Sequence, residues 1–116
     1  MKFYGDGKQI RDYIYIKDVV EALRILAVEG KNNQVYNLGS GKGNSLNDIL
    51  DIFKIDLKLN LSIDKVKFDS YDVQKNVLDI SKICRDINWS PKIELSDGIK
   101  RTRDFYHDYY KSAAST

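Results

Sequence analysis

The chain has 116 residues, which is enough for one domain with a single hydrophobic core. Hydrophobic residues make up 42% of it and charged residues 31%, a composition typical of folded globular proteins rather than disordered ones. The formal net charge of +2 comes from 19 basic and 17 acidic residues, so the overall charge does not indicate nucleic acid as a partner.

Location can also be predicted from composition. No apolar run is long enough to span a membrane, and the residues after Met1 lack the apolar core of a signal peptide. The single cysteine, Cys84, cannot form an internal disulfide and fits a reducing compartment. The sequence therefore predicts a cytoplasmic protein with no membrane contact.

The first half of the chain predicts two strand–helix units. Residues 13–16 are aromatic and β-branched, which favours a buried strand. The helix after it is expected to begin with a capping pair, Asp18 and Glu21, and to end at Gly30 in a left-handed conformation. Residues 34–38 predict the second strand.

A glycine-rich loop, residues 39–44, follows that strand. Ser45 and Asp48 then predict a capped helix. Because two strand–helix units follow each other, the sequence predicts an α/β fold with short strands and about four helices. Residues 57–64 alternate apolar and polar side chains, which indicates a half-exposed strand, and residues 65–75 are expected to form a loop.

The last part of the chain predicts two helices. After an extended segment at residues 76–79, a helix is expected from Ser81, ending before Pro91, with inward-facing Ile83, Cys84 and Ile87. The final helix is expected near Ser96, with one stripe formed by Leu95, Ile99, Thr102, Tyr106 and Tyr109. We expect one domain over residues 1–111 and a disordered tail over residues 112–116.

Two local motifs imitate catalytic or nucleotide-binding signatures. Tyr13 and Lys17 have the spacing YxxxK, which brings the two side chains together on a helix, at about 6 Å. On the predicted strand the same spacing separates them by roughly 13 Å, so Tyr13 is interpreted as a packing residue. The glycines of residues 39–43 match neither a P-loop nor the dinucleotide fingerprint, so a turn leading to Ser45 is the favoured interpretation.

Other candidate sites are weak. His107 is the only histidine and is expected at the surface, so the sequence predicts no metal site. Asp69 and Asp72 imitate a glycosidase pair but lie in a charged loop. A basic stretch with aromatic neighbours is interrupted by acidic residues, which favours a solvated face over a nucleic-acid surface; its basic members are Lys54, Lys58, Lys65 and Lys67.

Four blocks in order resemble the C-terminal part of the extended short-chain dehydrogenases, the NAD-dependent sugar-nucleotide epimerases and dehydratases. They are GDGKQIRDYIYIKDV at residues 5–19, YNLGSG at 36–41 followed by Ser45, NVLDISK at 76–82 leading to NWSP at 88–91, and LSDGIKRT at 95–102. The resemblance covers nearly the whole chain. It implies a small C-terminal substrate-binding subdomain without a complete Rossmann domain.

The resemblance also implies a substrate site. Arg11 stands where the family binds the diphosphate of a nucleoside-diphosphate sugar, and a planar guanidinium suits phosphate oxygens. Gln9 falls where the chain passes the nucleobase, and Asp72 where an acid binds the ribose hydroxyls. Asn76 is expected in the same pocket. Asp69 occupies a position where the family commonly has an arginine that contacts phosphate. Three explanations stay open: Lys67 or Lys75 makes this contact instead, the substrate site is altered, or the alignment of this loop with the family is shifted.

Two hypotheses follow for the function. The first is a nucleoside-diphosphate-sugar-binding fragment of such an enzyme, without catalytic residues of its own: NAD(P) belongs to the complete enzyme and no cofactor is bound by this chain. The second is a stand-alone interaction module that keeps the fold without catalysis. Under either hypothesis we expect self-association through apolar surface that a missing cofactor domain would cover.

Overall fold

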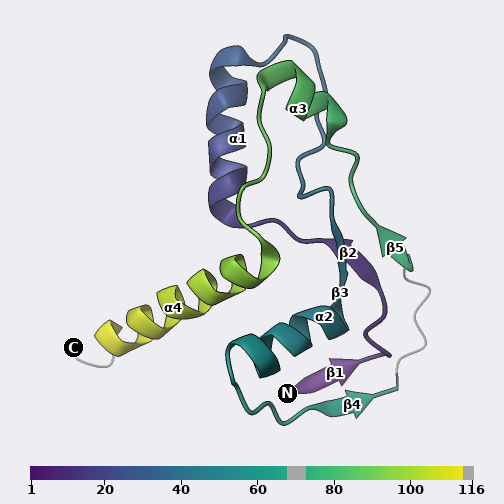
Figure 1. Ribbon diagram of the computed structural model, residues 1–116, viewed down its shortest axis with the longest axis vertical. Coiled ribbons are helices and arrows are strands. Elements are labelled where there is room, and N and C mark those ends of the chain that lie inside the picture. Colours follow the sequence, from purple (N-terminus) through teal and green to yellow (C-terminus); the bar gives the residue numbers. More distant parts are fainter. Residues whose placement is uncertain (68–72, 114–116) are drawn as a thin grey trace.

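A computed structural model describes residues 1–67 and 73–113 of the chain. Two small sheets run through the molecule (Figure 1). In one, β1 (Lys2–Tyr4) pairs in parallel with β4 (Asp64–Val66). In the other, β2 (Ile10–Asp12) is central, with β3 (Gly43–Ser45) antiparallel on one side and β5 (Lys75–Asn76) parallel on the other.

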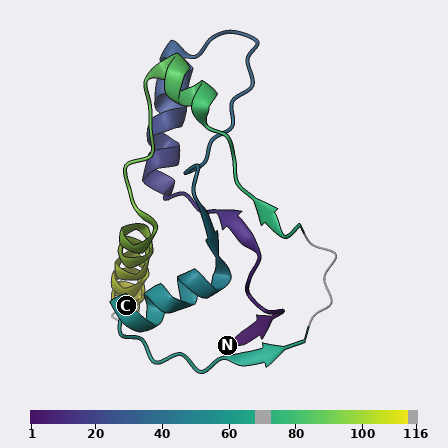
Figure 2. The ribbon, with the colours of Figure 1, turned by 45° about the vertical axis from the view of Figure 1, so that its right-hand side comes forward.

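The helices lie at both ends of the region that the two sheets form. They are α1 (Ile16–Glu29), α2 (Leu46–Asp51), which continues into the π-helical turn η1 (Ile52–Asp56), α3 (Ser81–Ile87) and α4 (Leu95–Ala113). Helices α1 and α3 pack together at one end, α2 lies near β1 and β4 at the other, and α4 projects outward (Figures 1 and 2). The predicted α/β class with short strands is confirmed.

The hydrophobic core lies between α1 and α3. Its buried members are Ala22, Ile83, Ile87 and Trp89, and half-buried side chains such as Cys84, Tyr36 and Leu38 pack against them. The inward orientation predicted for Ile83, Cys84 and Ile87 is thereby confirmed. Fully burying an aliphatic side chain of this size contributes roughly 1.5–3 kcal/mol, so each buried member of this cluster adds substantially to hydrophobic stability.

The first strand and the start of the first helix are displaced from their predicted positions. The strand is β2 at residues 10–12, and α1 already begins at Ile16, so the predicted strand over residues 13–16 is wrong. The carbonyl of Tyr15 accepts hydrogen bonds from the amides of Asp18 and Val19, which closes the first turn earlier than expected. Asp18 is therefore not a helix cap. It is buried within the first turn.

Three further predictions about the backbone were wrong. Gly30 has an extended conformation, with φ −64° and ψ 139°, and its amide bonds the carbonyl of Leu26. Residues 34–38 form no strand, because no other described segment pairs with them, and Val35 remains 84% exposed. Of residues 57–64 only Asp64 belongs to a strand, since Lys58 adopts a left-handed φ of 51° and breaks the extended path.

The C-terminal helices largely follow the sequence. Helix α3 begins at Ser81 as predicted, but it ends at Ile87 because Asn88 adopts a left-handed conformation, before Pro91 takes effect. Helix α4 begins at Leu95 and continues to Ala113. Ser112 and Ala113 are therefore helical and not part of a disordered tail, and residues 114–116 lie outside the described range.

Candidate functional site

Arg11 occupies the middle of the central strand β2. Its register partners are Asn44 on β3 and Asn76 on β5, so it stands between two amide side chains on neighbouring strands. Register partners share one face of a sheet. The guanidinium Nη1 donates to the carbonyl of Ile10 at 2.9 Å and to that of Val73 at 2.7 Å, which ties Arg11 to the segment that enters β5.

Asp12 is the hydrogen-bonding centre beside Arg11. Its Oδ1 accepts from the Ser40 amide at 2.6 Å and from the Ser40 hydroxyl at 2.5 Å. Its Oδ2 accepts from the amides of Gly41 at 3.0 Å and Leu78 at 3.3 Å. One carboxylate therefore joins β2 to the glycine-rich loop and to the segment after β5.

These contacts set the protonation of Asp12. Partial burial raises the pKa of the carboxyl, but hydrogen bonds from the Ser40 side chain and from the amides of Ser40, Leu78 and Gly41 lower it. The hydrogen bonds prevail, and the pKa lies below its ordinary value of 3.8. Asp12 is therefore a stable anion at neutral pH.

The contacts of Asp12 explain the glycine-rich loop. The amides of Ser40 and Gly41 in this loop donate to a carboxylate of the same chain. In nucleotide-binding loops, amides of this kind donate to a phosphate instead. A Cβ at Gly39 would lie 2.7 Å from Asp12 Oδ2, so a side chain at Gly39 would displace the carboxylate. Gly41 has a φ of +70°, which disfavours any other residue.

The structure brings two of the predicted site residues together and leaves one untested. Arg11 and Asn76 are register partners. Gln9 is half-buried directly before β2, and its Nε2 lies 3.6 Å from the Cβ position of Gly5, over the turn that precedes the strand. Asp72 lies outside the described residues, as does Asp69.

Sequence reasoning missed Asp12 and Asn44. In the sequence, Asp12 stands within the block at residues 5–19, and Asn44 stands at the end of the glycine-rich loop. No local signal in the sequence points to Asp12, because its hydrogen-bond partners lie 28 to 66 residues away. Asn44 gave no such signal, since its position depends on the register of β3 against β2.

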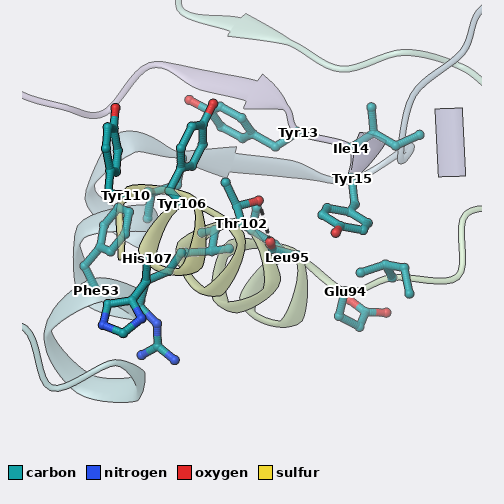
Figure 3. Close-up of a pocket in the computed structure, with 15 residues that line it drawn as sticks. Tyr13, Ile14, Tyr15, Phe53, Glu94, Leu95, Thr102, Tyr106, His107 and Tyr110 are labelled. Atoms are coloured by element: carbon teal, nitrogen blue, oxygen red, sulfur yellow. Dashed lines mark hydrogen bonds between the residues drawn. The ribbon is translucent and has the colours of Figure 1, made fainter. Parts of the chain in front are cut away.

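An apolar groove of about 560 Å³ lies along α4. Figure 3 shows it between α4, the segment from Tyr13 to Tyr15 and the α2–η1 segment, with Tyr106 and Tyr110 along one wall. Its lining is largely aromatic and aliphatic, which does not suit a diphosphate. A smaller cavity of about 80 Å³ borders the loop, where Tyr13, Ser40 and Asn44 meet.

The remaining motifs show no catalytic arrangement. Tyr13 lies in the link before α1, and Lys17 lies in the first turn of that helix, so the two do not form a pair on one helix. The His107 side chain is 61% exposed and lies 3.5 Å from Asp108. Within residues 1–67 and 73–113, no group of three or more His, Cys, Asp or Glu residues could hold a metal ion. No helix of these residues could cross a membrane.

Comparison with known proteins gives consistent results. The family profile described as GDP-mannose 4,6 dehydratase matches residues 1–102. A putative UDP-glucose 4-epimerase of Methanocaldococcus jannaschii is 37% identical over 98 residues, covering 84% of this chain and 31% of that protein. A UDP-glucuronate 4-epimerase of Thermodesulfobacterium geofontis is 34% identical over 103 residues, and the aligned part covers 88% of this chain and 32% of that protein.

Solved structures show the same relationship. A UDP-glucose 4-epimerase of Thermotoga maritima with UDP-glucose is 31% identical, with a TM-score of 0.85, over 95% of this chain and 35% of that one. A UDP-glucuronic acid 4-epimerase of Bacillus cereus in complex with UDP-glucuronic acid and NAD is 27% identical, with a TM-score of 0.83, over 94% and 35% of the two chains. The chain thus spans about a third of these relatives' length. Because the family profile covers most of the sequence, the chain belongs to the family of NAD-dependent sugar-nucleotide epimerases and dehydratases.

Proposed function

We propose that this chain binds a nucleoside-diphosphate sugar and that Arg11 holds the diphosphate. The placement of Arg11 in β2, between Asn44 and Asn76, carries this proposal. A permanently charged, planar donor beside two amide side chains offers several hydrogen bonds to phosphate and sugar oxygens. UDP-glucose and UDP-glucuronic acid are the ligands of the solved relatives, which supports this ligand class.

Gln9 and Asn76 complete the described part of the proposed site. Gln9 directly precedes the strand that carries Arg11 and would face the nucleobase, while Asn76 would reach the same ligand from β5. The assignment of Asp72 to the ribose hydroxyls stays a prediction, because Asp72 lies outside the described residues.

We further propose that these 116 residues are the substrate-binding fragment of an epimerase or dehydratase and catalyse no reaction alone. In this reaction class, hydride transfer requires a nicotinamide cofactor held against the sugar. The candidate pair Tyr13 and Lys17 does not share a helix, which supports a binding role. NAD(P) would belong to the complete enzyme.

Titration calorimetry tests the role of Arg11. The diphosphates of uridine, thymidine, guanosine and cytidine are titrated into the wild type, into Arg11→Ala and into a control, Lys8→Ala. Lys8 is a nearby exposed cation whose ammonium lies 3.9 Å from Asp6. Loss of a hydrogen bond to a charged group is worth about 1.5–3 kcal/mol, so Arg11→Ala is expected to weaken binding roughly tenfold or more.

Two results would contradict these proposals. Diphosphate binding that is equally strong in folded Arg11→Ala and in the wild type would refute the role of Arg11. Tight binding of NAD to the pure chain would refute the proposal that the cofactor site belongs to another part of the enzyme. Circular dichroism on each variant establishes that it is folded before titration.

A second proposal is self-association, which exposed apolar side chains favour. Ile16, Val20 and Leu23 form one exposed stripe on α1, each more than 50% accessible. Phe105, Tyr106, Tyr109 and Tyr110 form an exposed aromatic cluster on α4, with ring centroids 5.4–6.4 Å apart. Contiguous apolar surface of this kind is typical of protein interfaces.

The stand-alone interaction module remains the alternative function, and these surfaces are the observation that favours it. It predicts a protein partner and no nucleotide binding, so the calorimetric titration separates the two functions. We also propose a cytoplasmic location, because Cys84 is unpaired and fits a reducing compartment. Cell fractionation tests the location.

A further inference from the structure

The carboxylate of Asp12 joins three segments that are distant in sequence. They are β2, the loop before β3, and the segment directly after β5. We propose that Asp12 is a positioning residue: it aligns β3 and β5 against β2, so that Asn44 and Asn76 stand beside Arg11. The inference rests on the proposed function of Arg11 in diphosphate binding.

The shortness of the strands is the first argument. β5 has two residues and β3 has three, so each ladder contains few backbone hydrogen bonds. The amide of Leu78, two residues beyond β5, donates to Asp12 Oδ2 instead of a backbone carbonyl. The amides of Ser40 and Gly41, which precede β3, donate to the same side chain. Asp12 therefore extends the pairing on both sides of β2 beyond the end of the strands.

The contacts of Arg11 show how this alignment reaches the site. Its guanidinium donates to the carbonyl of Val73, close to the start of β5. Any shift of β5 relative to β2 moves this carbonyl and Asn76 together. Successive side chains of a strand point to opposite faces, so Asp12 acts on Arg11 through the backbone of the sheet and not by touching the ligand.

The glycines provide the second argument. A Cβ at Gly39 would approach Asp12 Oδ2 to 2.7 Å and Leu78 Cδ1 to 3.0 Å, and a Cβ at Gly43 would approach Ile10 Cγ2 to 2.6 Å and Val77 Cγ2 to 2.7 Å. The loop and β3 thus pack against β2 and the segment after β5 as closely as glycine permits. This gives the glycine-rich loop a role that does not involve a nucleotide: it encloses the carboxylate that aligns the site.

The variant Asp12→Asn tests the inference. An asparagine has one acceptor oxygen, and its amide NH2 group is itself a donor, so it cannot accept from the Ser40, Gly41 and Leu78 amides together. The matched control is Asp86→Asn on α3. Asp86 also accepts a hydrogen bond from a hydroxyl, that of Tyr36 at 3.2 Å, and it pairs with Lys31 at 3.1 Å. Its helix, α3, lies at the other end of the molecule from β1 and β4 and is separate from β2 (Figure 1). Ser40→Ala is a milder variant that removes one of the four hydrogen bonds to Asp12.

Two measurements are made on each variant: the dissociation constant for uridine diphosphate, and amide hydrogen exchange at residues 40, 41, 44, 76 and 78. We expect Asp12→Asn to weaken binding about tenfold and Ser40→Ala about threefold, with faster exchange at these amides. Asp86→Asn should change neither. In the Arg11→Ala background, Asp12→Asn should cause no further loss, because Asp12 acts through Arg11.

The results separate failure of this inference from failure of the proposed function. If Arg11→Ala weakens binding while folded Asp12→Asn and Ser40→Ala bind as the wild type does, the positioning role is refuted and diphosphate binding stands. An equal loss for Asp12→Asn with and without Arg11 also refutes it, since a general loss of stability does not depend on Arg11. If Arg11→Ala leaves binding unchanged, the proposed function fails, and with it the assignment of Asp12.

Discussion

Asp18 is a buried aspartate whose carboxylate holds two distant segments together. It lies in the first turn of α1 and accepts hydrogen bonds from the amides of Lys92 at 3.1 Å and Ile93 at 2.9 Å, in the link before α4. Asp18→Asn should lower the free energy of unfolding by about 2 kcal/mol, because hydrogen bonds to a charged group are worth about 1.5–3 kcal/mol. Urea unfolding measures this change.

Glu21→Gln is the control for Asp18. Glu21 forms a partly exposed ion pair with Lys92 at 2.8 Å in the same region. Exposed pairs contribute about 0–1 kcal/mol, so Glu21→Gln should have a small effect. Equal losses in the two variants would contradict the assigned importance of the buried contacts.

The pKa of Asp12 predicts a pH dependence of stability. The folded state holds this pKa below 3.8, so the unfolded chain takes up the proton first as the pH falls. The contribution of Asp12 is therefore complete above about pH 4 and is lost as the pH falls through the folded-state value. The difference in unfolding free energy between the wild type and Asp12→Asn should be constant at higher pH and should narrow as the pH falls from about 4 towards 3. A constant difference in urea unfolding over that range would be inconsistent with the assigned hydrogen bonds.

At the scale of elements, the capping box of α2 is a local feature that the sequence predicted and the structure confirms. The amide of Asp48 donates to the Ser45 hydroxyl, and the Asp48 carboxylate accepts from the Ser45 amide. Ser45→Ala should destabilise the protein by about 1 kcal/mol, as loss of a serine cap does in other helices. Thermal unfolding followed by circular dichroism measures it, with the exposed Ser62→Ala as control. No difference between the two variants would contradict the capping role.

The predicted elements that were correct depend on neighbours in the sequence. The Ser45 cap, the start of α3 at Ser81 and the inward face with Ile83 and Ile87 all follow from residues within one or two helical turns. The strands were misplaced because their partners are distant: β1 pairs with β4, and β2 with β3 and β5. Arg11 and Asn76 stand in blocks that resemble the family and could be named from them. The Asp12 contacts join residues 28 to 66 positions apart, so they depend on the folded chain.

At the scale of the whole molecule, the chain is more extended than a compact domain. The Cα radius of gyration is 17.3 Å, with extents of 48 × 44 × 23 Å. A compact domain of this length has a radius of gyration of about 13 Å. The excess is visible in the projecting α4 and in the separation of the α1–α3 pair from β1 and β4 (Figure 1). Exposed apolar surface accompanies this shape, on α1 and on α4.

An extended chain with a small core gains stability when another surface covers it. If the chain self-associates, folding is linked to association, and the thermal midpoint should rise with protein concentration. Leu23→Gln, in the exposed stripe of α1, should reduce both this dependence and the fraction of dimer in sedimentation. Lys17→Gln, exposed on the same helix outside the stripe, should change neither. A midpoint independent of concentration, with a monomer at every concentration tested, would contradict self-association and would leave the apolar face of α1 for a different partner.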